Sequence, residues 1–304
     1  MRSYLPLIYV LLFTLFWSLQ IFVSKLGFLA GAQLLPFLLQ SSILVFIILG
    51  GYVLLTKFKE LKKVPADVRI KLFLASSLHA AAGGLFSTAA ILYTTAVNAA
   101  FLFQFTTVAT IFFAWLILRE KMTRSKMLTV ILVMIGVFLF ITNGKLITPH
   151  VGDIFAITAC IAWSLGNVLI RGIIRKDPVD ADVSTFFRAA GNLIIPILFI
   201  VLFPIFSQTF KSVFQVNAFS FDIHIFPYIF GSALFVCLLS IFLNRALKVA
   251  SASYMTILSS LSPIAVAALA FIFLHETLSI VQILGASFIV FGGIITQYLK
   301  IDKD

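Results

Sequence analysis

The chain has 304 residues, of which 62% are hydrophobic and only 11% are charged, and its mean hydropathy is +1.14. A soluble domain of this length cannot bury so much apolar surface, so the composition excludes a soluble globular protein and predicts an all-α polytopic membrane protein. The formal net charge of +11 would suit a nucleic-acid-binding protein, but the basic residues lie in short loops between apolar runs, where membrane topology and anionic lipid headgroups explain them without nucleic acid.

Ten apolar runs are long enough, or nearly so, to cross a bilayer, which takes about 20 residues in a helix. The gaps between these runs are mostly short. We therefore predict ten transmembrane helices, over residues 4–24, 33–55, 71–93, 97–118, 126–143, 151–171, 184–205, 226–244, 250–273 and 279–299.

The Lys and Arg residues are distributed unevenly between the two sides that these helices define. If the N-terminus is cytoplasmic, 18 of them lie at the two termini and in the loops after even-numbered runs, whereas three lie in the loops on the other side. The positive-inside rule therefore predicts a multi-pass protein of the cytoplasmic (inner) membrane with both termini in the cytoplasm.

One segment of the chain occurs twice, with similar sequence and different charge. Residues 112–122 read FFAWLILREKM and residues 268–278 read ALAFIFLHETL, and the two glutamates, Glu120 and Glu276, are 156 positions apart. The first copy carries Arg and Lys around its turn, whereas the second copy carries neither. This difference is expected when the two copies cross the membrane in opposite directions.

The ten predicted helices divide into two halves of five, residues 1–145 and residues 146–304. An odd number of crossings in each half forces the second half to run in the opposite sense, in agreement with the charge of the repeated segment. The sequence thus predicts two inverted five-helix repeats, an arrangement typical of secondary transporters.

Several short motifs of the second half have a recognisable order and spacing. They read Gly152-Asp153-Ile154-Phe155-Ala156, then Ala162-Trp163-Ser164-Leu165-Gly166, then Ser262-Pro263, and then Glu276-Thr277-Leu278. Together with their duplication, they resemble the drug/metabolite transporter superfamily, in particular its EamA-type members with ten helices, over nearly the whole chain. The resemblance implies inverted five-helix repeats around a central cavity, alternating access, and export or exchange of small metabolites, among which amino acids and related compounds are common.

One position departs from the family pattern. The pattern has a proline near the middle of the fourth and ninth helices; Pro263 keeps it in the second half, but the equivalent residue of the first half is Thr107. Because a threonine restores the backbone N–H that proline lacks, we expect the helix over 97–118 to be straighter than the helix over 250–273.

His79 is the one titratable group that lies well inside a predicted helix, because all eleven Asp and Glu residues lie at helix ends or in loops. The carboxylate relay of many proton-coupled carriers is therefore not predicted. A functional interpretation makes His79 a cavity residue that binds substrate or takes up a proton. An equally weighted alternative is a neutral histidine hydrogen-bonded to a neighbouring serine or carbonyl.

Polar residues mark one face of the fourth predicted helix and part of the ninth. Gln104 and Thr107 are three positions apart and so share a helix face, and Tyr254 and Ser259 lie in the ninth helix. The hypothesis is that these faces line the cavity and hydrogen-bond the substrate. The alternative is hydrogen bonding between helices, which is worth roughly 0.6 kcal/mol per bond.

Trp17 and Trp163 occupy equivalent places in the first and sixth predicted helices, and Asn167 follows Trp163 by one helical turn. They are interpreted either as an aromatic wall of the cavity or as packing between the two repeats. Their depth argues against the interfacial belt in which membrane tryptophans usually lie.

Three basic residues, Lys25, Arg171 and Arg188, lie near the ends of predicted helices. Long cationic side chains at such positions usually extend to the headgroups. Arg188 is the deepest, and for it the alternative is contact with an anionic substrate group such as a carboxylate. For Glu120 and Glu276 we expect a cap or tether at the tight turns rather than contact with substrate.

The predicted function is a secondary transporter that exports a small organic metabolite, an amino acid or a related compound, by alternating access. Its partners are that substrate and the lipid bilayer, with no nucleic acid; no cofactor, metal site or catalytic residue is expected, because the chain has no HExxH, GxSxG, Walker or GxGxxG motif. Proton coupling through His79, exchange and uncoupled transport stay open, as does the oligomeric state. The alternatives are a flippase for a lipid-linked or amphiphilic substrate and a non-transporting receptor or scaffold.

Overall fold

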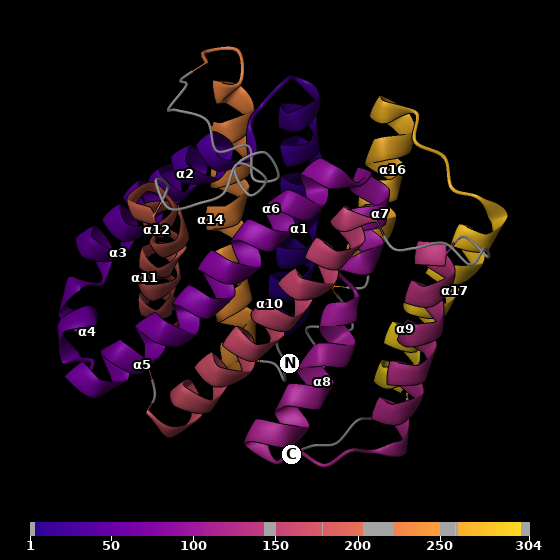
Figure 1. The fold of residues 1–304 in the computed structure, drawn as a ribbon. Helices are drawn as coiled ribbons and strands as arrows, with labels where there is room; N and C mark the ends of the chain where they lie inside the picture. The colour runs from indigo at the N-terminus through magenta and orange to yellow at the C-terminus, as the bar shows by residue number, and fades with distance from the viewer. Residues whose placement is uncertain are drawn as a thin grey trace.

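The computed structural model describes residues 4–142, 150–177, 179–202, 222–249, 259 and 261–298, and these residues form helices joined by short turns (Figure 1). The helices follow the apolar runs of the sequence, except α4, which lies between the runs predicted over 33–55 and 71–93. They are α1 (Leu5–Leu29), α2 (Leu34–Val45), η1 (Phe46–Gly50), α3 (Gly51–Thr56), α4 (Phe58–Lys63), α5 (Ala66–Ser77), η2 (Leu78–Ala82), α6 (Gly83–Tyr93), α7 (Ala96–Leu102), α8 (Phe105–Leu118), α9 (Arg124–Thr142), α10 (Val151–Lys176), α11 (Ala181–Asn192), α12 (Ile194–Leu202), α14 (Phe226–Val249), α16 (Ser262–Leu274) and α17 (Ile280–Tyr298).

In the part of the chain that the structure describes, six helical segments are long and apolar enough to cross a membrane. Two of them contain one π-helical turn each, because η1 joins α2 to α3 and η2 joins α5 to α6. The segments are Leu5–Leu29, Leu34–Thr56, Ala66–Tyr93, Ala96–Leu118, Val151–Lys176 and Phe226–Ala246. Shorter apolar helices follow at Ser262–Leu274 and Ile280–Gly292. The all-α membrane fold is thus confirmed in the described residues, while the count of ten transmembrane helices stays a prediction.

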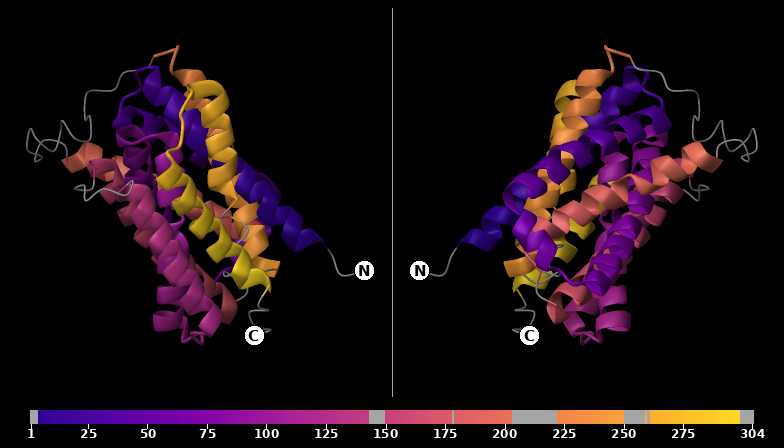
Figure 2. Two further views of the ribbon diagram at one scale, coloured as in Figure 1. Left: turned by 90° about the vertical axis from the view of Figure 1, so that its right-hand side faces the viewer. Right: turned by 90° about the vertical axis from the view of Figure 1, so that its left-hand side faces the viewer.

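The helices pack in pairs that the two halves of the chain reproduce. α1 packs along α14 and α16, and α10, its counterpart in the second half, packs along α6 and α8. Equivalent serines make equivalent bonds at these contacts: the Ser18 hydroxyl donates to the carbonyl oxygen of Ser262 at 3.3 Å, and the Ser164 hydroxyl donates to that of Thr106 at 3.1 Å. α9 and α17 lie side by side at one edge of the bundle (Figures 1 and 2).

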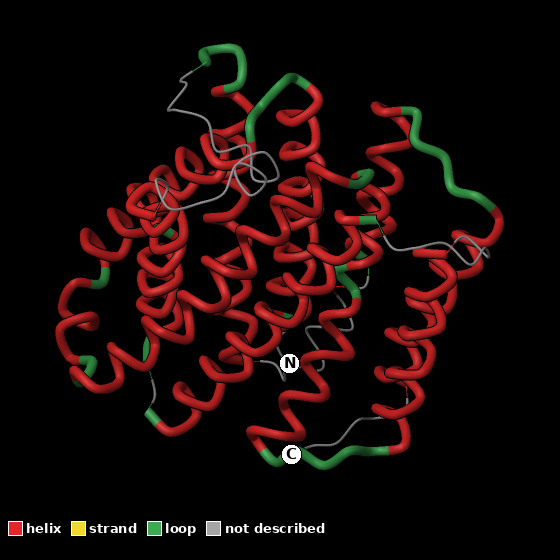
Figure 3. Tube along the Cα trace, viewed as in Figure 1, coloured by secondary structure: helices red, strands yellow, loops and turns green. Residues whose placement is uncertain are grey.

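The repeated segment has the same backbone geometry in both copies. Arg119 and His275 each end a helix with a left-handed φ of 55°. In each copy the glutamate that follows donates its backbone N–H six residues back at 3.2 Å, from Glu120 to Ala114 and from Glu276 to Ala270. The turn after α8 lies at the lower end of the bundle and the turn after α16 at the upper end (Figures 1 and 3).

The helix predicted over 97–118 is interrupted. Whether it is straighter than the helix predicted over 250–273 stays a prediction, because residues 250–258 and 260 lie outside the described residues. α7 ends at Leu102 and α8 begins at Phe105, and the bonds from Gln104 N to Phe101 O (3.1 Å) and from Thr107 N to Gln104 O (2.9 Å) tighten the chain between them. Donors from α10 reach the carbonyls of this break: the Cys160 thiol lies 3.6 and 3.5 Å from the oxygens of Leu102 and Phe103. These contacts compensate the lost helical bonds, so the break does not need a proline at Thr107.

Candidate substrate cavity

A cavity of about 180 Å³ lies at the centre of the bundle, between helices of the two halves. On this measure a single water needs about 10–15 Å³, so the cavity has room for a solute of several heavy atoms. Eight of the nine predicted site residues line it, and the ninth, Tyr254, lies outside the described residues. The eight are Trp17, His79, Gln104, Thr107, Trp163, Asn167, Arg188 and Ser259.

Aromatic rings form one wall of the cavity. Trp17 and Trp163 meet edge to face with ring centroids 5.9 Å apart. Phe103, at the break between α7 and α8, stacks on Trp17 at 6.3 Å and contacts Trp163 edge to face at 5.0 Å. The two tryptophans therefore line the cavity and also pack the two halves together, so the two interpretations given for them hold at the same time.

His79 lies in the π-helical turn η2, and π-helical turns occur frequently at functional sites. Its Nδ1 lies 3.2 Å from the carbonyl oxygen of Trp163. A carbonyl only accepts, so Nδ1 is assigned as the donor, which leaves Nε2 as an acceptor in the neutral ring. Gly166 makes this contact feasible, since a Cβ at that position would lie 2.5 Å from His79 Cβ.

Gln104 and Thr107 lie at the break between α7 and α8 and line the cavity, as does Ser259. Gln104 is only 2% exposed, and its Nε2 donates to the carbonyl oxygen of Ser259 at 3.5 Å, which is a long bond. Gln104 therefore lines the cavity and also connects two helices, while its bond to a substrate stays a prediction.

Arg188 does not extend to the headgroups. The behaviour that is usual for a basic residue near a helix end is therefore the wrong prediction for Arg188. α11 begins at Ala181, three residues before the predicted start, which places Arg188 two turns into the helix and only 3% exposed. Its Nε donates to Asn244 Oδ1 and its Nη2 to Asn167 Oδ1, each at 2.9 Å. Nη1 has no hydrogen-bond partner among the described residues.

Sequence reasoning missed several polar residues of the site. Asn244 was not predicted as a site residue, because it is the last residue of an apolar run and directly precedes Arg245. A polar residue at such a position indicates the start of a loop. Ser232 and Ser240 line the cavity from α14, eight positions apart, and this helical spacing could have identified them. None of the described lining residues is an aspartate or a glutamate.

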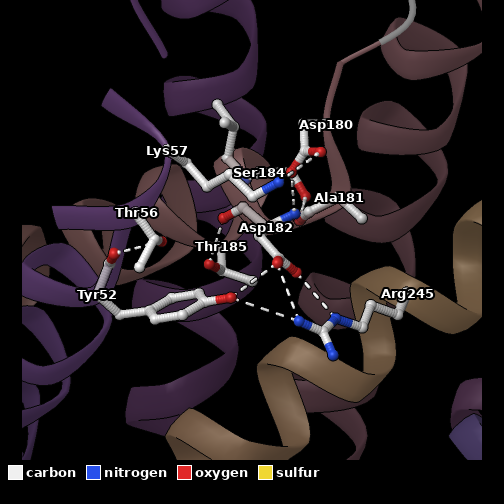
Figure 4. Close-up of polar contacts among 10 residues, drawn as sticks. Tyr52, Thr56, Lys57, Asp180, Ala181, Asp182, Ser184, Thr185 and Arg245 are labelled. Carbon is white, nitrogen blue, oxygen red and sulfur yellow. Dashed lines mark hydrogen bonds and ion pairs between the residues drawn. The ribbon is translucent and has the colours of Figure 1, made fainter. Parts of the chain in front are cut away.

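Two charged clusters connect the halves at the lower end of the bundle. Arg245 donates from Nε and Nη2 to the two carboxylate oxygens of Asp182 at 3.0 and 2.9 Å, and the Tyr52 hydroxyl donates to the same carboxylate at 2.9 Å (Figure 4). We call these three residues the Asp182 cluster. Glu120 forms the second cluster, with Arg171 at 2.8 Å and Lys126 at 3.5 Å. Arg171 thus pairs with a carboxylate rather than with headgroups, and Glu120 tethers its turn as expected.

At the upper end, two charged side chains bind backbone groups: Glu276 binds the other half of the chain, and Lys25 binds within the first half. Glu276 accepts from the backbone N–H groups of Ala96 and Val97 at 3.3 and 3.2 Å, so it caps α7 rather than its own turn. Lys25 donates to the carbonyl oxygens of Ile91 at 3.2 Å and Thr94 at 2.6 Å, at the end of α6. Lys25 is therefore held by protein carbonyls instead of extending to the headgroups.

The model of the EamA-like transporter family matches the sequence twice, over residues 5–142 and over residues 150–297. The chain is similar to an uncharacterized transporter of Clostridium kluyveri, with 29% identity over 304 residues that cover 95% of this chain and 91% of the relative. It is also similar to the uncharacterized transporter YyaM of Bacillus subtilis, with 27% identity over 207 residues, 66% of this chain and 64% of the relative. A solved structure described only as the crystal structure of a protein shares the fold, with a TM-score of 0.70 and 14% identity over 98% of both chains.

Proposed function

The chain belongs to the EamA-like transporter family, and from this premise we propose that it is a secondary carrier that exports a small organic metabolite across the cytoplasmic membrane. The observation that carries the proposal is the central cavity, which is lined from both halves of the chain by polar side chains set among apolar and aromatic ones. Its amides, hydroxyls and aromatic rings suit an amino acid or a related compound as substrate.

The proposal includes two inverted five-helix repeats. It is supported by the double family match, by the reciprocal packing of α1 and α10, and by the opposite positions of the two equivalent turns. Inverted repeats around one central site allow that site to face either side of the membrane by the movement of one half against the other.

Alternating access further requires contacts between the halves that close each end of the cavity in turn. The Asp182 and Glu120 clusters are suited to this role at the lower end. The Glu276 cap on α7 is suited to it at the upper end. In the proposed cycle, one set of these contacts breaks when the cavity opens to that side, and the other set stays closed.

Transport by purified protein in liposomes tests the proposal. The assay measures efflux and uptake of a panel of labelled L-amino acids, with and without a pH gradient. We expect saturable transport by the wild type, and a KM raised about fivefold in Gln104→Ala, because one hydrogen bond is worth about 1 kcal/mol. If His79 takes up the coupling proton, His79→Ala transports without dependence on the gradient.

Thr158→Ala is a matched control, since the Thr158 hydroxyl bonds to Ile154 of its own helix and does not line the cavity. Transport that is indifferent to Gln104→Ala and His79→Ala would contradict the site while leaving the carrier function intact. A wild type that moves no soluble solute but moves a fluorescent lipid analogue between leaflets would contradict the carrier proposal and favour the flippase.

A further inference from the structure

One residue of the cavity, Arg188, has no explanation if the substrate is simply any polar solute. Its guanidinium is buried at the middle of the bundle, and its two hydrogen-bond partners, Asn167 and Asn244, are both neutral. Nη1 of Arg188 and Nδ2 of Asn244 are buried and have no partner among the described residues. A buried charge is strongly unfavourable unless an opposite charge and hydrogen bonds compensate it.

Among the described residues, no carboxylate serves this purpose. Asp182 lies six residues before Arg188, or about 9 Å along α11, and both of its oxygens are bound to Arg245. The other described carboxylates lie in turns or near helix ends, away from the cavity. The undescribed internal residues, 143–149, 178, 203–221, 250–258 and 260, contain no Asp or Glu. The other undescribed acidic residues, Asp302 and Asp304, follow the end of α17. We therefore look for the compensating negative charge in a bound solute.

We propose that Arg188 binds a carboxylate group of the transported substrate, an inference that rests on the carrier function proposed above. A single guanidinium carries one positive charge, which matches one carboxylate, and its N–H groups bind carboxylate oxygens well. A phosphate ester would bring nearly two negative charges, and no second cation lines the cavity among the described residues. The substrate class is thus a small monocarboxylate.

The groups around Arg188 also indicate what else this substrate carries. Nε2 of His79 is an acceptor when Nδ1 donates to Trp163. An acceptor binds an ammonium or a hydroxyl group rather than a second carboxylate. A solute with one carboxylate and one donor group, as in an α-amino acid, satisfies both residues.

The test compares each L-amino acid of the panel with its carboxamide and with the amine left by decarboxylation, neither of which has a carboxylate. Liposomes with wild-type protein should take up the amino acids at least about tenfold better than either analogue, because charge-assisted hydrogen bonds are the strong ones. Arg188→Gln should abolish this preference. Arg188→Lys should retain part of it, since lysine keeps the charge and loses the planar fork. Lys59→Gln, which removes an exposed charge of α4, is the control and should behave as wild type.

A second measurement does not depend on transport. The Tm of the purified wild type is recorded in chloride-free buffer with an L-amino acid, with its carboxamide or with chloride. A rise with the amino acid alone supports the carboxylate site even if no transport is detected, in which case only the carrier proposal fails.

Three results would overturn the inference while leaving the carrier function in place. They are equal uptake of acids and carboxamides by the wild type, an unchanged preference in Arg188→Gln, and a Tm that rises with chloride and not with the amino acid. The last result would identify chloride as the counterion of Arg188.

Discussion

Two glycines set the distance between α10 and the helix that carries His79. A Cβ at Gly166 would lie 2.5 Å from His79 Cβ and 2.8 Å from its backbone nitrogen. A Cβ at Gly83 would lie 2.2 Å from Trp163 Cδ1. The position of both cavity residues therefore depends on the absence of side chains at these contacts, as in other close helix crossings in membranes.

Gly166→Ala tests this dependence. We expect the variant to lose about 1–3 kcal/mol of stability, because its methyl group meets backbone atoms that cannot move independently, and to lose transport because His79 and Trp163 shift. Thermal unfolding of the purified protein measures the first effect. Gly51→Ala is the control: nothing lies within 4 Å of its added Cβ, so it should be neutral or slightly stabilising. Equal Tm values for Gly166→Ala and wild type would contradict the argument.

At the scale of single residues, helix phase and depth predicted residues that line the cavity, while their contact with substrate stays a prediction. Three of these residues, Trp17, Trp163 and Gln104, line the cavity. Polar or aromatic side chains on the inner face of an apolar helix have few alternative positions inside the bundle. The burial of Arg188 was harder to predict, because it depends on the residue at which α11 begins. Hydropathy locates the end of a helix only within a few residues. The role of Asn244 depends on Arg188, so it could not be predicted without the fold.

Among the elements, the ends of α3, α11 and α14 meet at the Asp182 cluster (Figure 4). Asp182→Asn removes the charge that holds Arg245 and leaves the side-chain shape nearly unchanged. We expect the lower end to open more often, which exposes the lower part of the cavity. A cysteine introduced at Leu243, which lines the cavity, should then react several-fold faster with a membrane-impermeant maleimide than in the parent.

Asp67→Asn is the matched control, because it breaks an exposed ion pair with Lys71 within α5 that connects no other helix. The background replaces both native cysteines, Cys160 and Cys237. An equal labelling rate in Asp182→Asn and Asp67→Asn would show that the cluster does not close the cavity.

The interruptions of the helices were harder to predict than the helices themselves. The apolar runs located every described helix except the short α4. The break at Phe103 and Gln104 contains no proline or glycine that would have indicated it. It depends on a thiol and a hydroxyl from α10, Cys160 and Ser164, which lie more than 50 positions away in the sequence. Local sequence does not contain that information.

For the molecule as a whole, the proposed inversion makes a direct prediction about equivalent positions in the two copies of the repeated segment. Lys121 and Thr277 are both exposed and each follows the repeated glutamate by one residue. In intact cells, Thr277→Cys should react with an external impermeant maleimide, whereas Lys121→Cys should react only after permeabilisation. Reaction of both positions from the same side would contradict the inverted repeats.

The overall fold was predictable because it rests on features that extend over long stretches of sequence: hydropathy, basic loops and a repeated segment. The left-handed residues Arg119 and His275 show that even the backbone of that segment is duplicated. By contrast, the pairing of α9 with α17 depends on matched small residues. Gly136 faces Gly285 and Ile289 there, and Gly292 faces Thr129 and Val133. Such matches become evident only when the partner helix is known.

The aromatic wall has a practical consequence. Of the three tryptophans in the chain, Trp17 and Trp163 touch each other beside the cavity, whereas Trp115 lies on α8 with about half of its surface exposed. A molecule that enters the cavity changes the polarity around two of the three indoles and disturbs the coupling of their excited states. The fluorescence and near-ultraviolet circular dichroism of the unlabelled protein therefore report whether the cavity is filled.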